Sequence, residues 1–526
     1  MSGADAKRGG RAAWTPRANP WLIAVVVTLA AFMEVLDTTI VNVALPHIAG
    51  AMSASNDEAT WTLTSYLVAN GIVLPISGWL GRLIGRKRYF LICILGFTVC
   101  SLLCGIATDL YQLILFRLLQ GFFGGGLQPN QQSIILDSFP PAQRGAAFAV
   151  TAIATVVAPV LGPTLGGIIT DNASWRWIFY INIPVGIGTL IAVQALVEDP
   201  PWAGKGDRHI DGIGLGLIVI GLGCLQVVMD RGEDEDWFGS KLIIVFAILS
   251  ALGIGGAIVH LLTTEKPIVD LRVFKDRNFA VGCVCTAGCF GTLYASAVII
   301  PQLAQTILGY TATLAGYILS PGALLLLVVI PLMQRVMPLV QTRIIIMTGF
   351  IVLGFSLVLS NKLTPDVDFW TLVMFRAAQT VGLAFLFVPI TTITYSTLPK
   401  EMNGDGTALN TMFRNVFGSI GISLASALAT TRTQVNSAHL ADHLTPLDPA
   451  YNALVASNTA ALIQLGHTQA DAATRAVGMV YTTLRSQASI LGYADVFLFT
   501  SILAFALAPV ALLFTGSRMG AAKGGH

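Results

Sequence analysis

The chain alternates between long apolar blocks and short polar segments. Each block holds roughly 20 to 25 residues, enough for an α-helix to cross a hydrocarbon layer about 30 Å thick. The pattern predicts fourteen transmembrane helices, with the expected spans at residues 20–46, 61–82, 89–107, 110–136, 145–170, 176–197, 212–229, 241–262, 279–303, 312–333, 343–360, 369–395, 405–431 and 489–515. We therefore expect an all-α integral membrane protein.

The distribution of Lys and Arg predicts the orientation of the chain. If the N-terminus is cytoplasmic, about 20 basic residues flank the spans on the cytoplasmic side and about 7 on the other, as the positive-inside rule requires. Residues 1–19 and 516–526 are then cytoplasmic tails, and the membrane is the cell (inner) membrane. The long loop 432–488 lies outside, and its Ala-rich stretch 450–487 predicts a short helical hairpin that contacts a partner, acts as a lid or is an inert insertion.

Composition and motifs exclude several classes of function. Of the 526 residues, 54% are apolar and 11% charged, and the net charge of +2 includes no dense basic run that could follow a nucleic-acid backbone. All seven cysteines lie inside apolar blocks, which indicates packing rather than disulfides or a thiolate metal cage. The sequence contains no GxxxxGK[ST], HExxH or GxSxG, so we expect neither an ATP-driven pump nor an enzyme.

One histidine pair has a spacing that metals use. His439 and His443 flank Asp442, which makes an external zinc site conceivable, but a solvated helix face fits the segment better. We therefore predict no metal.

Two carboxylates within the first span are the most informative residues. Glu34 and Asp37 are three residues apart and share one helix face, far inside the apolar layer. A charge there is costly unless it is paired or hydrated, which suits a group that binds and releases a proton. Arg117 in the fourth span is the natural countercharge. The alternatives are a fixed ion pair for the acids and, for Arg117, a permanent strut bonded to backbone carbonyls.

An internal repeat connects the fourth span with the twelfth. The sequence FRLLQ at 116–120 recurs as FRAAQ at 375–379, and each copy precedes an intramembrane proline, Pro129 or Pro389. The matches favour duplicated halves around a central cavity, the usual architecture of secondary transporters.

Two glycine-rich segments are candidate gates. The turn at 78–88 (GWLGRLIGRKR) could latch one conformation, with topogenesis as the alternative, and the stretch 158–167 (APVLGPTLGG) could form a seal or hinge, with ordinary membrane packing as the alternative. The gating candidates are Gly78, Gly85, Arg86, Arg88, Gly162, Pro163, Gly166 and Gly167.

Together these motifs resemble the major facilitator superfamily, in particular its fourteen-helix drug:proton antiporters of the EmrB/QacA type. The resemblance is carried by LDTTIVNVALP at 36–46, WTLTSYLVANGIVLPISGWL at 61–80, LILFRLLQG at 113–121, GPTLGG at 162–167 and WRWIFYINIP at 175–184. It implies a proton-coupling role for Arg117 alongside Asp37. The chain departs from the family pattern at Arg82, where an acidic residue is usual, and at Ala158, where glycine is usual.

The resemblance also implies the domain layout. Residues 20–197 form the N-terminal six-helix bundle, 279–431 and 489–515 the C-terminal one, and 198–278 a linker with two extra helices. The cavity should lie between the bundles, and its candidate lining residues are Phe32, Phe123, Gln128, Tyr294, Gln379 and Phe385.

The implied function is proton-coupled export of lipophilic or cationic compounds by alternating access, with the proton gradient in place of any cofactor. The nearest alternative is a proton-coupled exporter of one endogenous metabolite, siderophore or amino acid. An importer, a membrane-embedded enzyme and a scaffold subunit fit the motifs less well. If the source cell has two membranes, the resemblance implies a periplasmic adaptor and an outer-membrane channel as partners.

Overall fold

A computed structural model describes residues 16–200, 210–364, 367–442, 444–445 and 447–515; side chains 56, 57, 153, 156, 160, 163, 171, 312 and 313 are also outside the description. Most of both predicted tails, the linker segment 201–209, His443 of the possible zinc site and the Pro163 side chain therefore lie outside the described part.

The N-terminal half contains eight helices. They are α1 (Pro20–Ala51), α2 (Asn56–Ile84), α3 (Arg86–Ile106), α4 (Leu110–Gly124), α5 (Leu127–Ser138), α6 (Pro141–Asn172), α7 (Trp177–Tyr180) and α8 (Asn182–Leu196). Polar caps start several of them: the Ser55 hydroxyl accepts from the Glu58 amide at 3.1 Å while Glu58 accepts from the Ser55 amide at 2.8 Å. Between α2 and α3 the chain turns at Gly85, whose φ of +96° favours glycine.

The fourth predicted span, 110–136, is broken. Gly125 and Gly126 separate α4 from α5, and a β-carbon at Gly125 would lie 2.7 Å from the Asn70 carbonyl oxygen of α2. The glycines thus allow the broken span to approach its neighbours closely.

Of the remaining helices, the first two lie in the linker and the others form the C-terminal half. They are α9 (Gly212–Arg231), α10 (Lys241–Thr263), α11 (Arg277–Thr306), α12 (Ala312–Val336), α13 (Thr342–Ser360), α14 (Phe369–Thr394), α15 (Asn403–Ala441), α16 (Pro449–Gln464) and α17 (Gln469–Leu507). The inner linker helix α9 packs against α2 and α15, one from each half, whereas α10 packs on the outside of α9.

The helical membrane fold is confirmed. Within the described residues, twelve helices are long and apolar enough to cross a membrane, or thirteen if the bent α6 is counted as one span. The segments α4 and α5, with 15 and 12 residues, together occupy the remaining predicted span. The total of fourteen stays a prediction.

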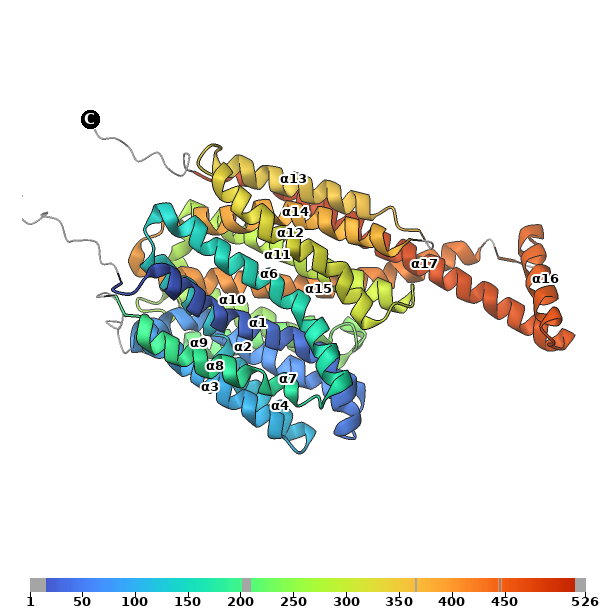
Figure 1. Ribbon diagram of the computed structural model, residues 1–526, viewed down its shortest axis with the longest axis horizontal. Helices are drawn as coiled ribbons and strands as arrows, with labels where there is room; N and C mark the ends of the chain where they lie inside the picture. Colours follow the sequence, from blue (N-terminus) through green and yellow to red (C-terminus); the bar gives the residue numbers. More distant parts are fainter. Residues whose placement is uncertain (1–15, 201–209, 365–366, 443, 446, 516–526) are drawn as a thin grey trace, which may run out of the picture.

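The predicted helical hairpin is present, but the two spans beside it are longer than expected. α15 and α17 each have 39 residues and so are about 58 Å long, well beyond the spans expected at 405–431 and 489–515. The hairpin consists of α16 and the first part of α17, which runs without interruption into the last span, and it projects from the bundle (Figure 1). The Ala-rich sequence continues the helix after the apolar pattern has ended.

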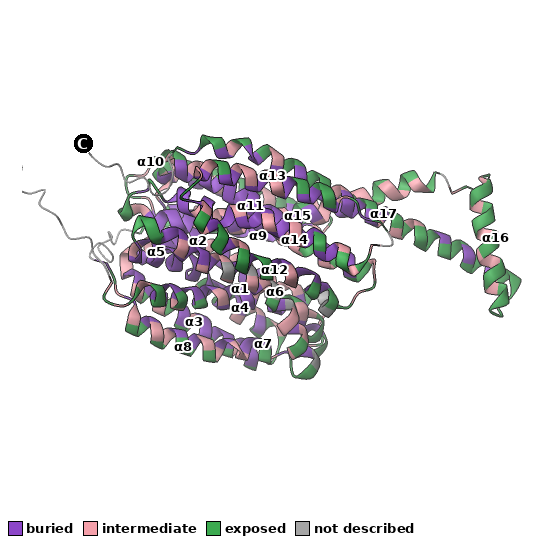
Figure 2. Ribbon diagram, turned by 45° about the horizontal axis from the view of Figure 1, so that its top comes forward, coloured by how far each residue is buried: buried purple, intermediate pink, exposed green. Residues whose placement is uncertain are grey.

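Buried residues divide into two large cores, one mainly within each half. The outward faces are apolar as well, for example Leu22, Val25 and Leu29 along one side of α1, as expected where side chains meet lipid. Figure 2 shows buried residues concentrated inside the bundle and exposed ones on its outside and along the hairpin.

The bundle has two distinct ends. The described chain starts and finishes at one of them, which we call the termini end, and α16 lies beyond the opposite one, the hairpin end (Figure 1).

Candidate functional site

Asp37 of α1 and Arg117 of α4 form an ion pair in the middle of the N-terminal half. Arg117 Nη1 lies 2.5 Å from Asp37 Oδ2, and neither side chain is exposed at all. Arg117 also donates from Nε to the Thr62 carbonyl of α2 at 3.2 Å, and its guanidinium lies 4.2 Å from the centre of the Tyr66 ring. Arg117 is therefore the expected countercharge of Asp37, and it also makes the bond to a backbone carbonyl that the alternative proposed.

Neutral polar side chains complete this site. Gln120 Nε2 donates to Asp37 Oδ1 at 3.1 Å, and Asn182 Nδ2 donates to the same oxygen at 2.7 Å. Gln120 Oε1 accepts from Arg117 Nη1 at 2.8 Å, and Ser101 Oγ accepts from Asn182 at 3.0 Å. Asp37 thus accepts from three side chains, whereas Arg117 Nη2 has no partner among the described residues.

Glu34 forms a second site one helical turn away, and this site involves both halves. Asn70 of α2 donates to Glu34 Oε1 at 3.0 Å, and Gln128 of α5 donates to Oε2. Arg414 of α15, in the C-terminal half, lies within electrostatic range of Glu34. Glu34 is 3% exposed and Arg414 is 5% exposed, so both side chains are removed from water.

The C-terminal repeat has its own buried arginine. Arg376 Nη1 donates to Ser296 Oγ of α11 at 2.6 Å and to Gln379 Oε1 at 3.4 Å, while Gln379 donates to Ser360 Oγ at 2.9 Å. In the described part of the chain, no carboxylate pairs with Arg376.

The six candidate lining residues are divided between the interface and the interior of each half. Gln128 binds Glu34, and Tyr294 lies in electrostatic range of Glu34 and Arg414. The others pack within their own halves: Phe32 against Val35, Leu36 and Ala158, Phe123 against Gly96, Phe385 against Gly349, and Gln379 as described above. A role in substrate binding stays a prediction for all six.

At the termini end the two halves are in close contact. Gly78 of α2 faces Gly404 of α15 so closely that a β-carbon at Gly78 would lie 2.7 Å from the Gly404 carbonyl oxygen. Arg82 forms an ion pair with Asp405 across this contact, and Ser133 Oγ of α5 lies 2.6 Å from Thr407 Oγ1. The family's usual acidic position is thus filled by a cation that binds the opposite half.

Neighbouring groups fix the turn after α2. Arg86 forms an ion pair with Asp137 at the end of α5, while Arg88 is exposed. A β-carbon at Gly85 would lie 2.8 Å from a carboxylate oxygen of Asp199.

The glycine stretch of α6 packs against α1. A β-carbon at Gly162 would lie 2.1 Å from Thr39 Oγ1, and one at Gly166 would lie 3.0 Å from the Ile40 carbonyl oxygen. Gly167 has open space around it. Two of the three glycines therefore allow the close contact between α6 and the helix that carries both acids.

This arrangement, two helical halves with buried acid–base pairs in the membrane, defines the class of secondary transporters. A family model described as Major Facilitator Superfamily matches residues 27–422. The chain is 36% identical over 478 residues to the multidrug export protein EmrB of Escherichia coli strain K12, which covers 90% of this chain and 91% of that one. It is 37% identical to the fatty acid resistance protein FarB of Neisseria gonorrhoeae, and the match covers 92% of this chain and 94% of that one.

The fold agrees with a solved structure, the human organic anion transporter MFSD10, at a TM-score of 0.56 and 12% identity; the match covers 93% of this chain and 100% of that one. The chain belongs to the Major Facilitator Superfamily and, within it, to the EmrB-type family.

Proposed function

We propose that the protein is a proton-coupled multidrug exporter that moves lipophilic or cationic compounds by alternating access between the halves 20–197 and 279–515. The observation that carries this proposal is the completely buried pair of Asp37 and Arg117, together with Glu34 one turn away at the interface with Arg414. The names of the relatives, a multidrug export protein among them, support the type of cargo.

The two acids suggest a division of labour. Asp37 exchanges its proton when the contact with Arg117 is made or broken, because the guanidinium favours the carboxylate form. Glu34 responds to the position of the C-terminal half. Its neighbours Asn70 and Gln128 belong to the N-terminal half, whereas Arg414 belongs to the C-terminal half. An organic cation near Glu34 would compete with Arg414.

The contacts at the termini end support one state of this cycle. Arg82–Asp405, Gly78–Gly404 and Ser133–Thr407 close the bundle there, so the opposite state requires these contacts to separate. By the positive-inside rule we assign the termini end to the cytoplasm, and the membrane to the cell (inner) membrane. In a two-membrane cell, a periplasmic adaptor and an outer-membrane channel would continue the path, reached through loop 432–488.

The energetics are sufficient. One proton falling through about 150 mV supplies about 3.4 kcal/mol, enough for a concentration ratio of a few hundred for a neutral cargo.

The test is transport in proteoliposomes with an imposed pH gradient. Ethidium should move against its concentration gradient, in the direction opposite to protons, and an ionophore that collapses the gradient should stop it. Transport that persists after collapse would contradict proton coupling. If a single amino acid, siderophore or other metabolite moves while ethidium and unrelated cations do not, the alternative of a dedicated metabolite exporter holds instead.

A further inference from the structure

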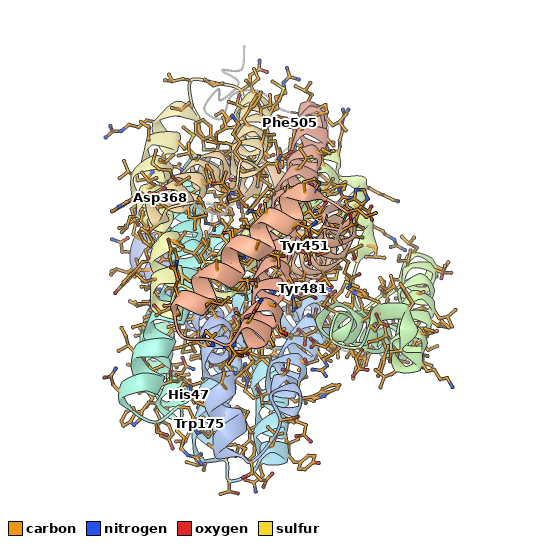
Figure 3. All side chains as sticks on the ribbon, turned by 90° about the vertical axis from the view of Figure 1, so that its right-hand side faces the viewer. His47, Trp175, Asp368, Tyr451, Tyr481 and Phe505 are labelled. Carbon is orange, nitrogen blue, oxygen red and sulfur yellow. The ribbon has the colours of Figure 1, made fainter. Side chains whose placement is uncertain are left out.

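A large cavity lies at the hairpin end, away from Asp37 and Glu34. Its volume is about 1260 Å³, and its walls come from α9, α11, α15 and α17, with Leu67 of α2 at one side. Drug-sized ligand sites usually measure about 300 to 1,000 Å³. Figure 3 looks onto this end, with Tyr481 of the cavity wall labelled among the projecting helices. We call this space the outer cavity.

Hydroxyl groups line one wall of the outer cavity. They recur on α15 at intervals of four and three residues, which places them on one helix face: Ser419, Ser423, Ser426, Thr430, Thr433 and Ser437. One of them stands out. Ser423 is only 6% exposed, yet its hydroxyl has no hydrogen-bond partner among the described residues. A buried hydroxyl without a partner is unfavourable, so a ligand with a polar group would satisfy it.

Another part of the wall, formed by α9 and the residues after it, is acidic. Asp230, Glu233 and Asp234 line the cavity. In the described part of the chain, Arg485 is the one cation among the residues that line it. Two of the acids have partners: Glu233 accepts from Trp237 Nε1 at 2.9 Å, and Asp234 lies 3.5 Å from Arg231, which is not a wall residue.

Asp230 differs from these two acids. Its Oδ2 atom accepts a hydrogen bond from the Thr64 hydroxyl of α2, which fixes the carboxylate in place. The cation of the next residue, Arg231, lies within electrostatic range of this carboxylate. Tyr481 and Tyr493 add aromatic surface to the same space, and aromatic faces attract cations.

From these observations we propose that the outer cavity binds organic monocations with an apolar body. Asp230 supplies the negative charge, Ser423 accepts an N–H of the ligand, and Leu67, Tyr481 and Tyr493 contact its apolar part. The inserted helix α9 thereby contributes a binding group. It is also bonded to α15, because Gln226, one turn before Asp230, donates to Ser419 at 3.2 Å.

The test places a thiol in the cavity of the full-length protein. Ser426→Cys introduces it, and the seven native cysteines are all buried, so a neutral, membrane-impermeant maleimide should react chiefly at position 426. The probe is phenylbutylammonium. Two matched compounds accompany it: phenylbutyltrimethylammonium, a cation without N–H, and phenylbutanol, which is neutral. The measured quantity is the concentration that halves the rate of labelling.

Both cations should protect position 426, and phenylbutanol should protect at least about tenfold less well. Asp230→Asn, which keeps an acceptor for Thr64, should raise the half-protecting concentration of both cations roughly tenfold. Glu235→Gln is the matched control: it removes a charge five residues away that does not line the cavity, and should change protection less than about twofold. Ser423→Ala should weaken phenylbutylammonium alone, by about threefold.

Equal protection by phenylbutanol would overturn the proposal, as would unchanged protection in Asp230→Asn. The assay needs no transport. In an Asp37→Asn background protection should be retained, so failure of this site and failure of proton-coupled export give separate results.

Discussion

The two halves of the protein contain the same arginine motif with different partners. Arg117 and Arg376 are each followed three residues later by a glutamine whose Oε1 accepts from the guanidinium, at 2.8 and 3.4 Å. In the N-terminal half, the first helix provides Asp37 to the arginine. In the C-terminal half, α11 provides Ser296 at 2.6 Å. The motif is thus shared, but only the N-terminal copy contains an acid.

This difference indicates where proton exchange takes place. A buried cation that binds a neutral hydroxyl holds its helices together but has no nearby group to titrate. A buried cation beside a carboxylate makes the proton affinity of that carboxylate depend on their separation. The C-terminal copy is therefore suited to a structural role and the N-terminal copy to coupling.

The largest effect is expected from removing the acid. Asp37→Asn keeps a side chain of the same shape, so the protein should fold, but proton-driven ethidium transport should fall at least about 100-fold because no proton can be exchanged there. The matched change in the other half, Ser296→Ala, should leave at least about half of the transport rate. Equal losses in both variants would break the comparison.

A second variant asks whether an acid in the C-terminal copy can substitute. Asp37→Asn combined with Ser296→Asp places the carboxylate beside Arg376 instead of Arg117. We expect no recovery of proton-driven transport, because Glu34, which lies in electrostatic range of Arg414, is one turn from Asp37 and far from Ser296 in the sequence. Recovery to more than about a tenth of the original rate would mean that any buried acid–arginine pair suffices.

The two arginines should also differ in their contribution to stability. Arg117→Gln leaves the Asp37 carboxylate buried without its cation, a change that typically costs about 3 to 5 kcal/mol. Arg376→Gln removes a cation that has no acidic partner and should cost roughly 1 kcal/mol or less. Thermal unfolding in detergent at pH 8 compares the variants, and an order opposite to this one would contradict the assignment.

The smallest effect concerns the contact between the halves. Gly78→Ala would bring its β-carbon within 2.7 Å of backbone at Gly404, whereas a β-carbon at Gly404 would have its nearest neighbour, the Gly78 oxygen, at 3.5 Å. Gly78→Ala should open the termini end, raising the labelling rate of a thiol placed by Ser133→Cys about fivefold, by analogy with overpacking penalties. Gly404→Ala is the control and should change it less than about twofold.

The sequence predicted the helices and the main ion pair because both leave strong signals. Long apolar blocks indicate spans, and a charge within such a block needs a partner, which connects Asp37 with Arg117. The partners Gln120, Asn182 and the Thr62 carbonyl could not be foreseen. Neutral polar groups are common in membrane helices, and their convergence depends on how α2, α4 and α8 pack.

Other features depend on packing across the halves. Arg414 lies within the predicted span 405–431, but its position near Glu34 depends on the packing of α15 against the other half. The pairing of Arg82 with Asp405 joins residues more than 300 positions apart, and no local pattern announces it. The extent of α15 and α17 was missed because helical propensity continues after hydrophobicity ends.

The most direct measurement is proton release when substrate binds to the purified protein in detergent, where no gradient exists. A weakly buffered solution with a pH indicator reports protons displaced by ethidium. We predict release from the unaltered protein and from Ser296→Ala, and none from Asp37→Asn at saturating ethidium. Undiminished release from Asp37→Asn would contradict the assignment of Asp37 as the exchanging group.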